Sequence, residues 1–222
     1  MSRTVRLVGM AHSKLRNAIG LVGIEADPVK QEVQVRFVKH WERNELNQIP
    51  VDVAEFYEKF QWTNTIIDLQ VGEHVIQGLR RIANLPIRVI FIKKKVVDPS
   101  EIRRVKTLAL IEMVQYMLEL KLAHKIKFPK NPTETMQMLE SQFALYSEHT
   151  TEAGGIDYYS PGDELDNLTK ALITVTFAAR PFIHDSVRVV CGPVKQKSAA
   201  SIEDLSYEIN KPRKRKRIIK GI

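Results

Sequence analysis

Two or three acidic side chains open a helix whose following turns are apolar, in the stretch GDELDNLTKAL at residues 162–172. Acids in a first helical turn cap free N–H groups and face the positive end of the helix dipole, so Asp163 is expected to be the cap. That role does not account for Asp166, which lies beside Leu165 and Leu168 near the face expected to turn toward the core. A carboxylate there needs a partner, and a divalent cation is one candidate.

A second acid ends an apolar segment much earlier in the chain. Residues 64–69 (NTIIDL) predict a strand with Asp68 at its end, and Gly72 follows at the turn into a helix. Taken alone, Asp68 is more simply a turn aspartate and Asp166 an acid in a first helical turn. Ligands of α/β sheets bind beyond the C-terminal ends of parallel strands, and the two acids together point to one such edge.

Acids at such an edge suit two-metal phosphodiester hydrolysis. Carboxylates hold two Mg²⁺ or Mn²⁺ ions about 4 Å apart, of which one activates water and the other stabilises the leaving oxygen. The only cysteine is Cys191, which excludes an internal disulfide and a Cys-based zinc site. The six histidines form no H-x-x-x-H or H-E-x-x-H pair, so oxygen ligands are favoured.

Three strands are expected to precede these acids. Residues 4–10 and 18–25 are dense in Val, Ile and Leu, and residues 32–40 alternate apolar and polar side chains. Asp27 and Pro28 mark a turn between the second and third strands. Short connections of this kind predict an antiparallel meander.

Strands and helices then alternate. Asp52 and Glu55 resemble a capping box that opens a helix, and strands at 64–69 and 87–92 flank a helix over 73–82. This order with short links predicts parallel pairing through right-handed crossovers.

The remaining segments close the domain. In order, we expect a long buried helix from Pro99-Ser100 to about residue 123, a short strand KIKFP, a helix over about 133–146 capped at Thr133, a loop over 149–155, an edge strand IDYYS, the acid-led helix from Asp163 to about Ala179, and a strand SVRVVC beyond Pro181. The pattern predicts an α/β fold with a mixed sheet, three antiparallel strands and then parallel strands, flanked by helices.

Length and charge indicate one domain and an appendage. With 222 residues and 44% apolar content, the chain can bury one sizeable core, placed at residues 1–183, with an extension over 184–222. Residues 211–222 hold seven of the basic residues and no acid, which leaves +1 of the net +8 for the rest of the chain. Such an arm binds polyanions or serves as an address, and a solvated tail is an equal alternative. Its candidate nucleic-acid contacts are Lys211, Arg213, Lys214, Arg215, Lys216 and Arg217.

The N-terminal segment MSRTVRLVGMAHSK lacks the apolar region of a signal peptide, and no run approaches membrane-spanning length. We therefore expect an intracellular protein with no membrane partner, cytoplasmic in the host cell if viral.

The order of the elements and the local sequences of several segments over residues 4–183 resemble those of the nuclease domain of viral terminase large subunits, in the ribonuclease-H-like superfamily. The segment NTIIDLQVGEHVIQGLRR is similar to the family's strand–acid–Gly–helix stretch, and DNLTKAL resembles its H-D-D-L-x-x-A-L signature. The resemblance implies a divalent-metal-dependent DNA endonuclease of viral DNA processing and packaging. It implies Asp68 and Asp166 as catalytic metal ligands, aided by Asp163, Asn167 or His12.

The sequence departs from the family in its first strand. The family has an essential aspartate there, where this chain has VGMAH at residues 8–12, and no acid occurs before Glu25. Asp166-Asn167 also stands where the family often has paired aspartates. Fewer negative charges weaken the binding of two dications, so the alternative is a degenerate relative that binds DNA or a packaging partner without cleavage. An unrelated α/β protein with acidic caps is a third hypothesis.

The ATPase half of a packaging motor is not in this sequence, because no G-x-x-x-x-G-K-[ST] motif occurs. The chain is therefore expected to be a stand-alone nuclease-like domain, a split gene product or a fragment. A separate packaging ATPase or a portal-like protein is its expected partner.

Overall fold

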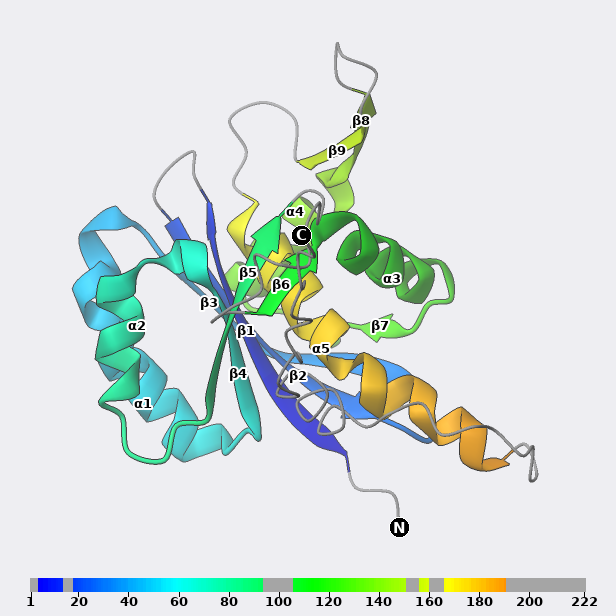
Figure 1. The fold of residues 1–222 in the computed structure, drawn as a ribbon, viewed down its shortest axis with the longest axis horizontal. Coiled ribbons are helices and arrows are strands. Elements are labelled where there is room, and N and C mark those ends of the chain that lie inside the picture. The colour runs from blue at the N-terminus through cyan, green and yellow to red at the C-terminus, as the bar shows by residue number, and fades with distance from the viewer. Residues whose placement is uncertain (1–3, 14–17, 94–105, 151–155, 160–165, 191–222) are drawn as a thin grey trace, which may run out of the picture. The chain divides into compact units, whose positions relative to one another are not determined.

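The structure is a computed structural model, and the residues that it describes are 4–13, 18–93, 106–150, 156–159 and 166–190 (Figure 1). The sheet and its helices belong to one unit, residues 1–188, and residues 189–222 form a second. Among the described residues, no helix combines the length and the apolar composition that a bilayer span requires.

Seven strands of the described chain form one mixed sheet in the order β6-β5-β4-β1-β2-β3-β7. The strands are β1 (Val5–Ser13), β2 (Ala18–Asp27), β3 (Glu32–Trp41), β4 (Asn64–Asp68), β5 (Ile87–Lys93), β6 (Lys106–Ala109) and β7 (Ile126–Lys127). The predicted meander is confirmed, because β1 pairs antiparallel with β2 and β2 with β3. The predicted parallel half is also confirmed, since β4 pairs parallel with both β1 and β5.

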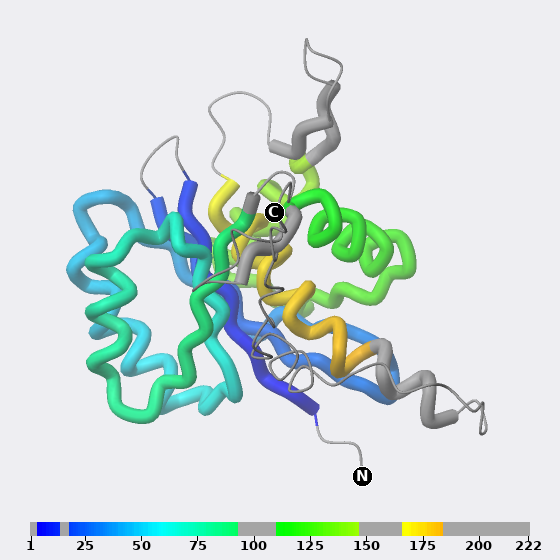
Figure 2. The backbone as a smooth tube through the Cα atoms, viewed as in Figure 1, coloured from blue at the N-terminus to red at the C-terminus, as the bar shows by residue number. Residues whose placement is uncertain are grey.

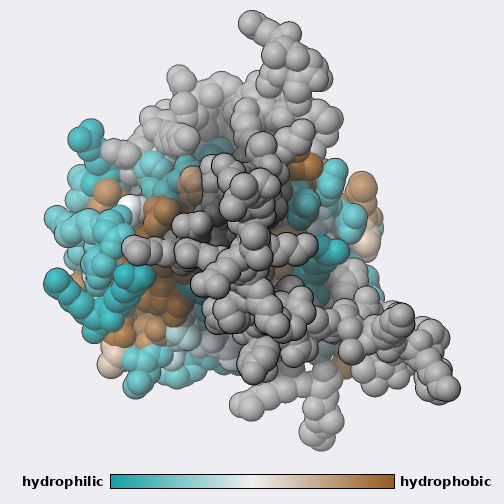
Figure 3. Space-filling model, in the orientation of Figure 1, coloured by the Kyte–Doolittle hydropathy of each residue, from teal (hydrophilic) through white to brown (hydrophobic). Residues whose placement is uncertain are grey.

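Helices cover the sheet on both sides (Figures 1 and 2). They are α1 (Ile49–Phe60), α2 (Glu73–Arg80), α3 (Leu110–Leu122), α4 (Glu134–Leu145) and α5 (Asn167–Val190), with two short 3₁₀ helices, η1 (Arg43–Gln48) and η2 (Leu69–Val71). In Figure 3 the described surface over α1 and α2, on the left, is mostly hydrophilic, as expected of amphipathic helices.

A separate hydrophobic core fills each side of the sheet. On the side of α1 and α2, which we call the α1 face, the strands contribute Val8, Met10 and Ile67. On the opposite side, the α5 face, the strands contribute Ala11 and Ile66, and they pack against α3, α4 and α5. Successive residues of a regular strand alternate between the two faces, so the cores give the faces of the residues in β1 and β4, whereas β2 and β3 have a register shift at Gly23 and Ile24.

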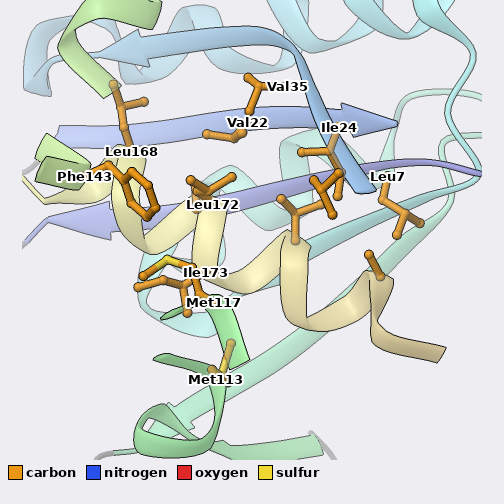
Figure 4. Packing of buried hydrophobic residues seen from close by; sticks show 14 of the residues in the cluster. Leu7, Val22, Ile24, Val35, Met113, Met117, Phe143, Leu168, Leu172 and Ile173 are labelled. Carbon is orange, nitrogen blue, oxygen red and sulfur yellow. The ribbon is translucent and has the colours of Figure 1, made fainter. Parts of the chain in front are cut away.

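Helix α5 lies over the centre of the α5 face. Figure 4 shows its residues Leu168, Leu172 and Ile173 packed among strand and helix side chains. Val22 from the sheet and Met117 from α3 belong to the same hydrophobic core. This burial fixes α5 against the sheet, and with it Asp166, the residue that immediately precedes the helix.

Three predicted helix boundaries are wrong. Helix α1 starts at Ile49 with Pro50 in its first turn, because the Asp52 carboxylate does not cap the helix and instead accepts a hydrogen bond from Trp41 Nε1 at 2.8 Å. The helix expected from Pro99 begins only at Leu110, since residues 106–109 pair with β5 as strand β6. Residues 94–105 lie outside the described residues.

The third wrong boundary concerns α5, which begins at Asn167 rather than Asp163 and continues through Pro181 to Val190. The strand predicted at SVRVVC is therefore helical over its described residues. The loop predicted from residue 149 is also wrong at its start, because β8 (Ser147–Thr150) pairs antiparallel with β9 (Ile156–Tyr159). The IDYYS segment is thus one strand of a two-stranded sheet.

Candidate metal site at the rim of the sheet

Asp68 is the last residue of β4 and is buried, with 4% of its surface exposed. One carboxylate oxygen, Oδ1, accepts a hydrogen bond from the backbone N–H of Gln70 at 3.2 Å and caps η2. Asp68 therefore does act as a turn aspartate, as the simpler interpretation expected.

The side chain of Asp68 belongs to the α5 face. Ile66, two residues earlier in β4, and Ile90, its partner in β5, both belong to the core on that face. In the parallel pair of β1 and β4, Met10 is opposite Ile67, so Ala11 continues the register beside Asp68. Asp68 therefore faces α5 from the strand next to β1.

Asp166 immediately precedes α5, and 6% of its surface is exposed. Its backbone carbonyl accepts the first helical hydrogen bond, from the N–H of Lys170 at 2.9 Å, which makes Asp166 the N-cap residue. Its carboxylate oxygen Oδ2 lies 2.7 Å from Lys170 Nζ, whereas Oδ1 has no hydrogen-bond partner among the described residues. Asp163, the cap expected from the sequence, lies outside the described residues.

The first turn of α5 lies directly on β2. A Cβ atom added to Gly20 would be 2.9 Å from the backbone carbonyl of Asn167, so only glycine permits this approach. Gly20 pairs with Ala11 of β1, which in turn continues the register beside Asp68. Two strand spacings of about 4.8 Å therefore separate the backbones of Asp68 and Gly20. The two acids share one rim and one face of the sheet, with Ala11 between them.

Gln142 of α4 caps α5 from another helix. Its side-chain oxygen accepts hydrogen bonds from the N–H groups of Leu168 and Thr169, at 3.0 and 3.4 Å. These are the groups that an N-cap side chain normally satisfies. Because Gln142 takes that role, the carboxylate of Asp166 is released from capping and is available for another partner.

Asn167 is held in the same network. Its Oδ1 accepts from Gln142 Nε2 at 3.5 Å, and its Nδ2 lies 3.0 Å from His40 Nδ1. Burial lowers the pKa of His40, against the opposing charges of Glu42 and Glu45, so the neutral ring can accept a hydrogen bond at Nδ1 near pH 7. The amide of Asn167 is therefore committed to positioning α5, and neither Gln142 nor His40 was predicted from the sequence.

We predict that Gln142→Ala destabilises the domain by about 2 kcal/mol, because two buried N–H groups at the start of α5 lose their acceptor. Gln137→Ala, an exposed position on the same helix, should change stability by less than about 0.5 kcal/mol. Urea unfolding of both variants measures the difference. Equal stability of the two variants would show that the side chain of Asp166 or water replaces Gln142 at no cost.

His12 does not join this site. It pairs with Ile19 in the β1–β2 register, and Ile19 belongs to the core on the α1 face. Residues opposite each other in an antiparallel pair share a face, so His12 lies on the other side of the sheet from Asp68. The register therefore does not bring His12 to the face that carries Asp68, and its role as a ligand stays a prediction. The β1 residues on the α5 face are Ala11 and Ser13.

The donor atoms at this rim fit a hard cation. Besides Asp166 Oδ1, the hydroxyls of Ser13 and Thr169 are buried on the same side of the sheet without a hydrogen-bond partner among the described residues. Buried polar atoms of this kind call for an ion or water, and carboxylate and hydroxyl oxygens suit Mg²⁺ or Mn²⁺. No cluster of three His, Cys, Asp or Glu residues occurs in the described part of the chain.

No family model and no curated protein matches the sequence. The fold is similar to that of the large terminase nuclease from thermophilic phage G20c, with a TM-score of 0.58 at 10% identity, over 80% of this chain and 83% of that one. The nuclease domain of the SPP1 large terminase, solved with bound Mn, gives 0.50 at 15% identity, over 78% and 86% of the two chains.

The whole large terminase of bacteriophage HK97 gives a TM-score of 0.53 at 14% identity, over 81% of this chain but only 40% of the longer one. These similarities establish the fold, and they confirm the predicted ribonuclease-H-like mixed sheet flanked by helices.

Proposed function

We propose that this chain is a terminase-type nuclease domain, a divalent-metal-dependent DNA endonuclease that acts in viral DNA processing and packaging. The observation that supports this most is the common position of Asp68 and Asp166, two buried acids on one face and at one rim of the sheet. This is the place where α/β folds bind ligands, beyond the C-terminal ends of parallel strands.

In this proposal Asp68 and Asp166 hold Mg²⁺ or Mn²⁺, with Asp163 as a further ligand. Bound metal would activate water and stabilise the leaving oxygen of the phosphodiester. The protein's part is to fix the two acids. The β4 strand holds Asp68 between β1 and β5, and the Gln142–Asn167–His40 network holds the first turn of α5.

The relatives supply the chemistry of the proposal. Large terminase nucleases of this fold have been solved with bound magnesium, cobalt and Mn. The substrate we propose is DNA, with phosphate contacts from the basic arm at residues 211–222. Because the HK97 large terminase is more than twice as long as the matched part, a separate packaging ATPase or a portal-like protein is the proposed partner.

Supercoiled plasmid tests this function directly. The full chain with Mn²⁺ or Mg²⁺ is expected to convert it to nicked circles, and excess EDTA should stop the conversion, because in this proposal the bound metal activates the attacking water. Agarose electrophoresis separates the two plasmid forms. Complete absence of nicking at every metal concentration, with the folded protein in excess, would refute the nuclease.

Two residues favour a second function, DNA or partner binding without cleavage. Ala11 is apolar at the position between the two acids, and Lys170 offsets the charge of Asp166. Both reduce the negative charge available for metal. A gel-shift complex with duplex DNA in the absence of any nicking would support this alternative.

A further inference from the structure

The Asp166 carboxylate already has a cation beside it. Lys170, one helical turn further along α5, places its Nζ atom 2.7 Å from Asp166 Oδ2. Residues four apart lie on the same side of a helix, which is why this contact forms within the first turn. The chain thus supplies a positive charge of its own at the position of the proposed metal ligand.

The two partners of this ion pair differ in their freedom to move. The Asp166 side chain is 9% exposed and stands on a backbone held by the first bond of α5. The Lys170 side chain is 27% exposed, and its four-carbon stem lets the ammonium reach water without moving the helix. The carboxylate is therefore the fixed partner and the ammonium the movable one.

The ion pair with Lys170 satisfies only one of the two carboxylate oxygens of Asp166, Oδ2. Oδ1 of Asp166 is buried without a partner among the described residues, and the hydroxyl of Thr169, one turn along the same helix, is in the same state. A dication that bound Oδ1 would lie within a few ångströms of the Lys170 ammonium. Like charges at such a distance repel strongly at a site with little water.

We propose that Lys170 is a built-in competitor for the divalent cation at Asp166. The ammonium occupies one carboxylate oxygen in the free protein, and metal binds only as Lys170 swings outward. Lys170 thereby sets the metal affinity of the site and keeps it low. This inference rests on the proposed metal site but not on cleavage, since it concerns affinity alone.

Titration of the full chain with Mn²⁺ tests this inference, with free Mn²⁺ followed by electron paramagnetic resonance. Lys170→Met should bind Mn²⁺ about tenfold more tightly than the wild type, because no ammonium has to be displaced. Lys170→Arg keeps the charge and should leave the affinity within about twofold of the wild type.

A lysine ion-paired elsewhere provides the matched control. Lys39 lies 3.3 Å from Asp52 Oδ2, so Lys39→Met makes the same change of charge at another Lys–Asp pair. Lys39→Met should leave the Mn²⁺ affinity unchanged. If it instead raised the affinity as much as Lys170→Met does, the effect would come from the net charge of the protein, and the inference would be overturned. Asp166→Asn combined with Lys170→Met should remove the gain.

The outcomes separate this inference from the proposed function. Unchanged or weaker Mn²⁺ binding by Lys170→Met, in a protein whose wild type binds Mn²⁺ through Asp166, refutes the competitor and leaves the nuclease standing. Absence of Mn²⁺ binding in every variant refutes both. Circular dichroism melting shows whether Lys170→Met is folded, and Lys170→Gln provides a second neutral variant if it is not.

Discussion

Asp68→Asn and Asp166→Asn are each expected to slow metal-dependent nicking of supercoiled DNA about a thousandfold, a loss of roughly 4 kcal/mol in transition-state stabilisation. The substitution keeps the size of the side chain and removes its charge, and charge is what holds a dication in place. In Asp68→Asn the amide oxygen of the new side chain can still accept the hydrogen bond from Gln70, so the turn after β4 should persist. Initial rates of plasmid nicking, at saturating Mn²⁺ and at equal protein concentration, measure the loss.

Two variants on the α1 face are the controls for this prediction. Asp52→Asn makes the same substitution at an acid that bonds Trp41 and Lys39 on the opposite face of the sheet, and His12→Ala removes the histidine that lies on that face. Both should nick at close to the wild-type rate. Equal activity of all four variants would assign the nicking to a contaminant, and loss at Asp166 alone would leave Asp68 as a turn aspartate only.

The strand that carries Asp68 was predictable because strand patterns are local. Apolar segments and short turns were enough to predict the meander and β4, and the end of β4 gave Asp68 its place at the rim. The direction of the parallel strands predicted the edge of the sheet at which Asp166 lies. The face of the sheet on which each β1 residue lies could not be predicted in this way, because it depends on which residues of β1 and β4 are opposite each other.

The face of each β1 residue explains why His12 is not brought to the same face as Asp68. Met10 and His12 are the residues of the first strand whose side chains stand out near the position of the family's aspartate, but both belong to the α1 face. The residue beside Asp68 is Ala11, whose side chain has no polar or ionisable group. Strand alternation could have separated the two sets, had the register with β4 been known.

Long-range contacts explain what the sequence could not reveal. His40 and Gln142 are 127 and 25 residues from Asn167, and no local pattern links them. Strand β6 was predicted as helix because residues 106–109 acquire their hydrogen bonds from β5, a partner that the local pattern does not contain. The same holds for Asp52, which Trp41 draws away from the helix cap.

Gly9→Ala is expected to destabilise the domain by about 3 kcal/mol, because α5 lies on the backbone of β1 at this point. A Cβ atom at residue 9 would overlap the carbonyl oxygen of Ala171 and lie 2.9 Å from Val175 Cβ. The nearest atom belongs to helix backbone, which cannot rotate away, so the whole helix must lift. Urea unfolding of the variant gives the change in the free energy of unfolding.

The same displacement should weaken the proposed site. Lifting α5 moves Asp166 away from Asp68, so Mn²⁺ affinity and folding stability should fall together in Gly9→Ala. Gly78→Ala is the matched control, since its new Cβ would meet only side-chain atoms, two ring carbons of Pro50 at 2.8 and 3.7 Å, and the helix gains about 1 kcal/mol in propensity. Its stability should stay close to that of the wild type. A Gly9→Ala protein as stable as the wild type would mean that α5 is not fixed against β1, and the common position of the two acids would lose its physical basis.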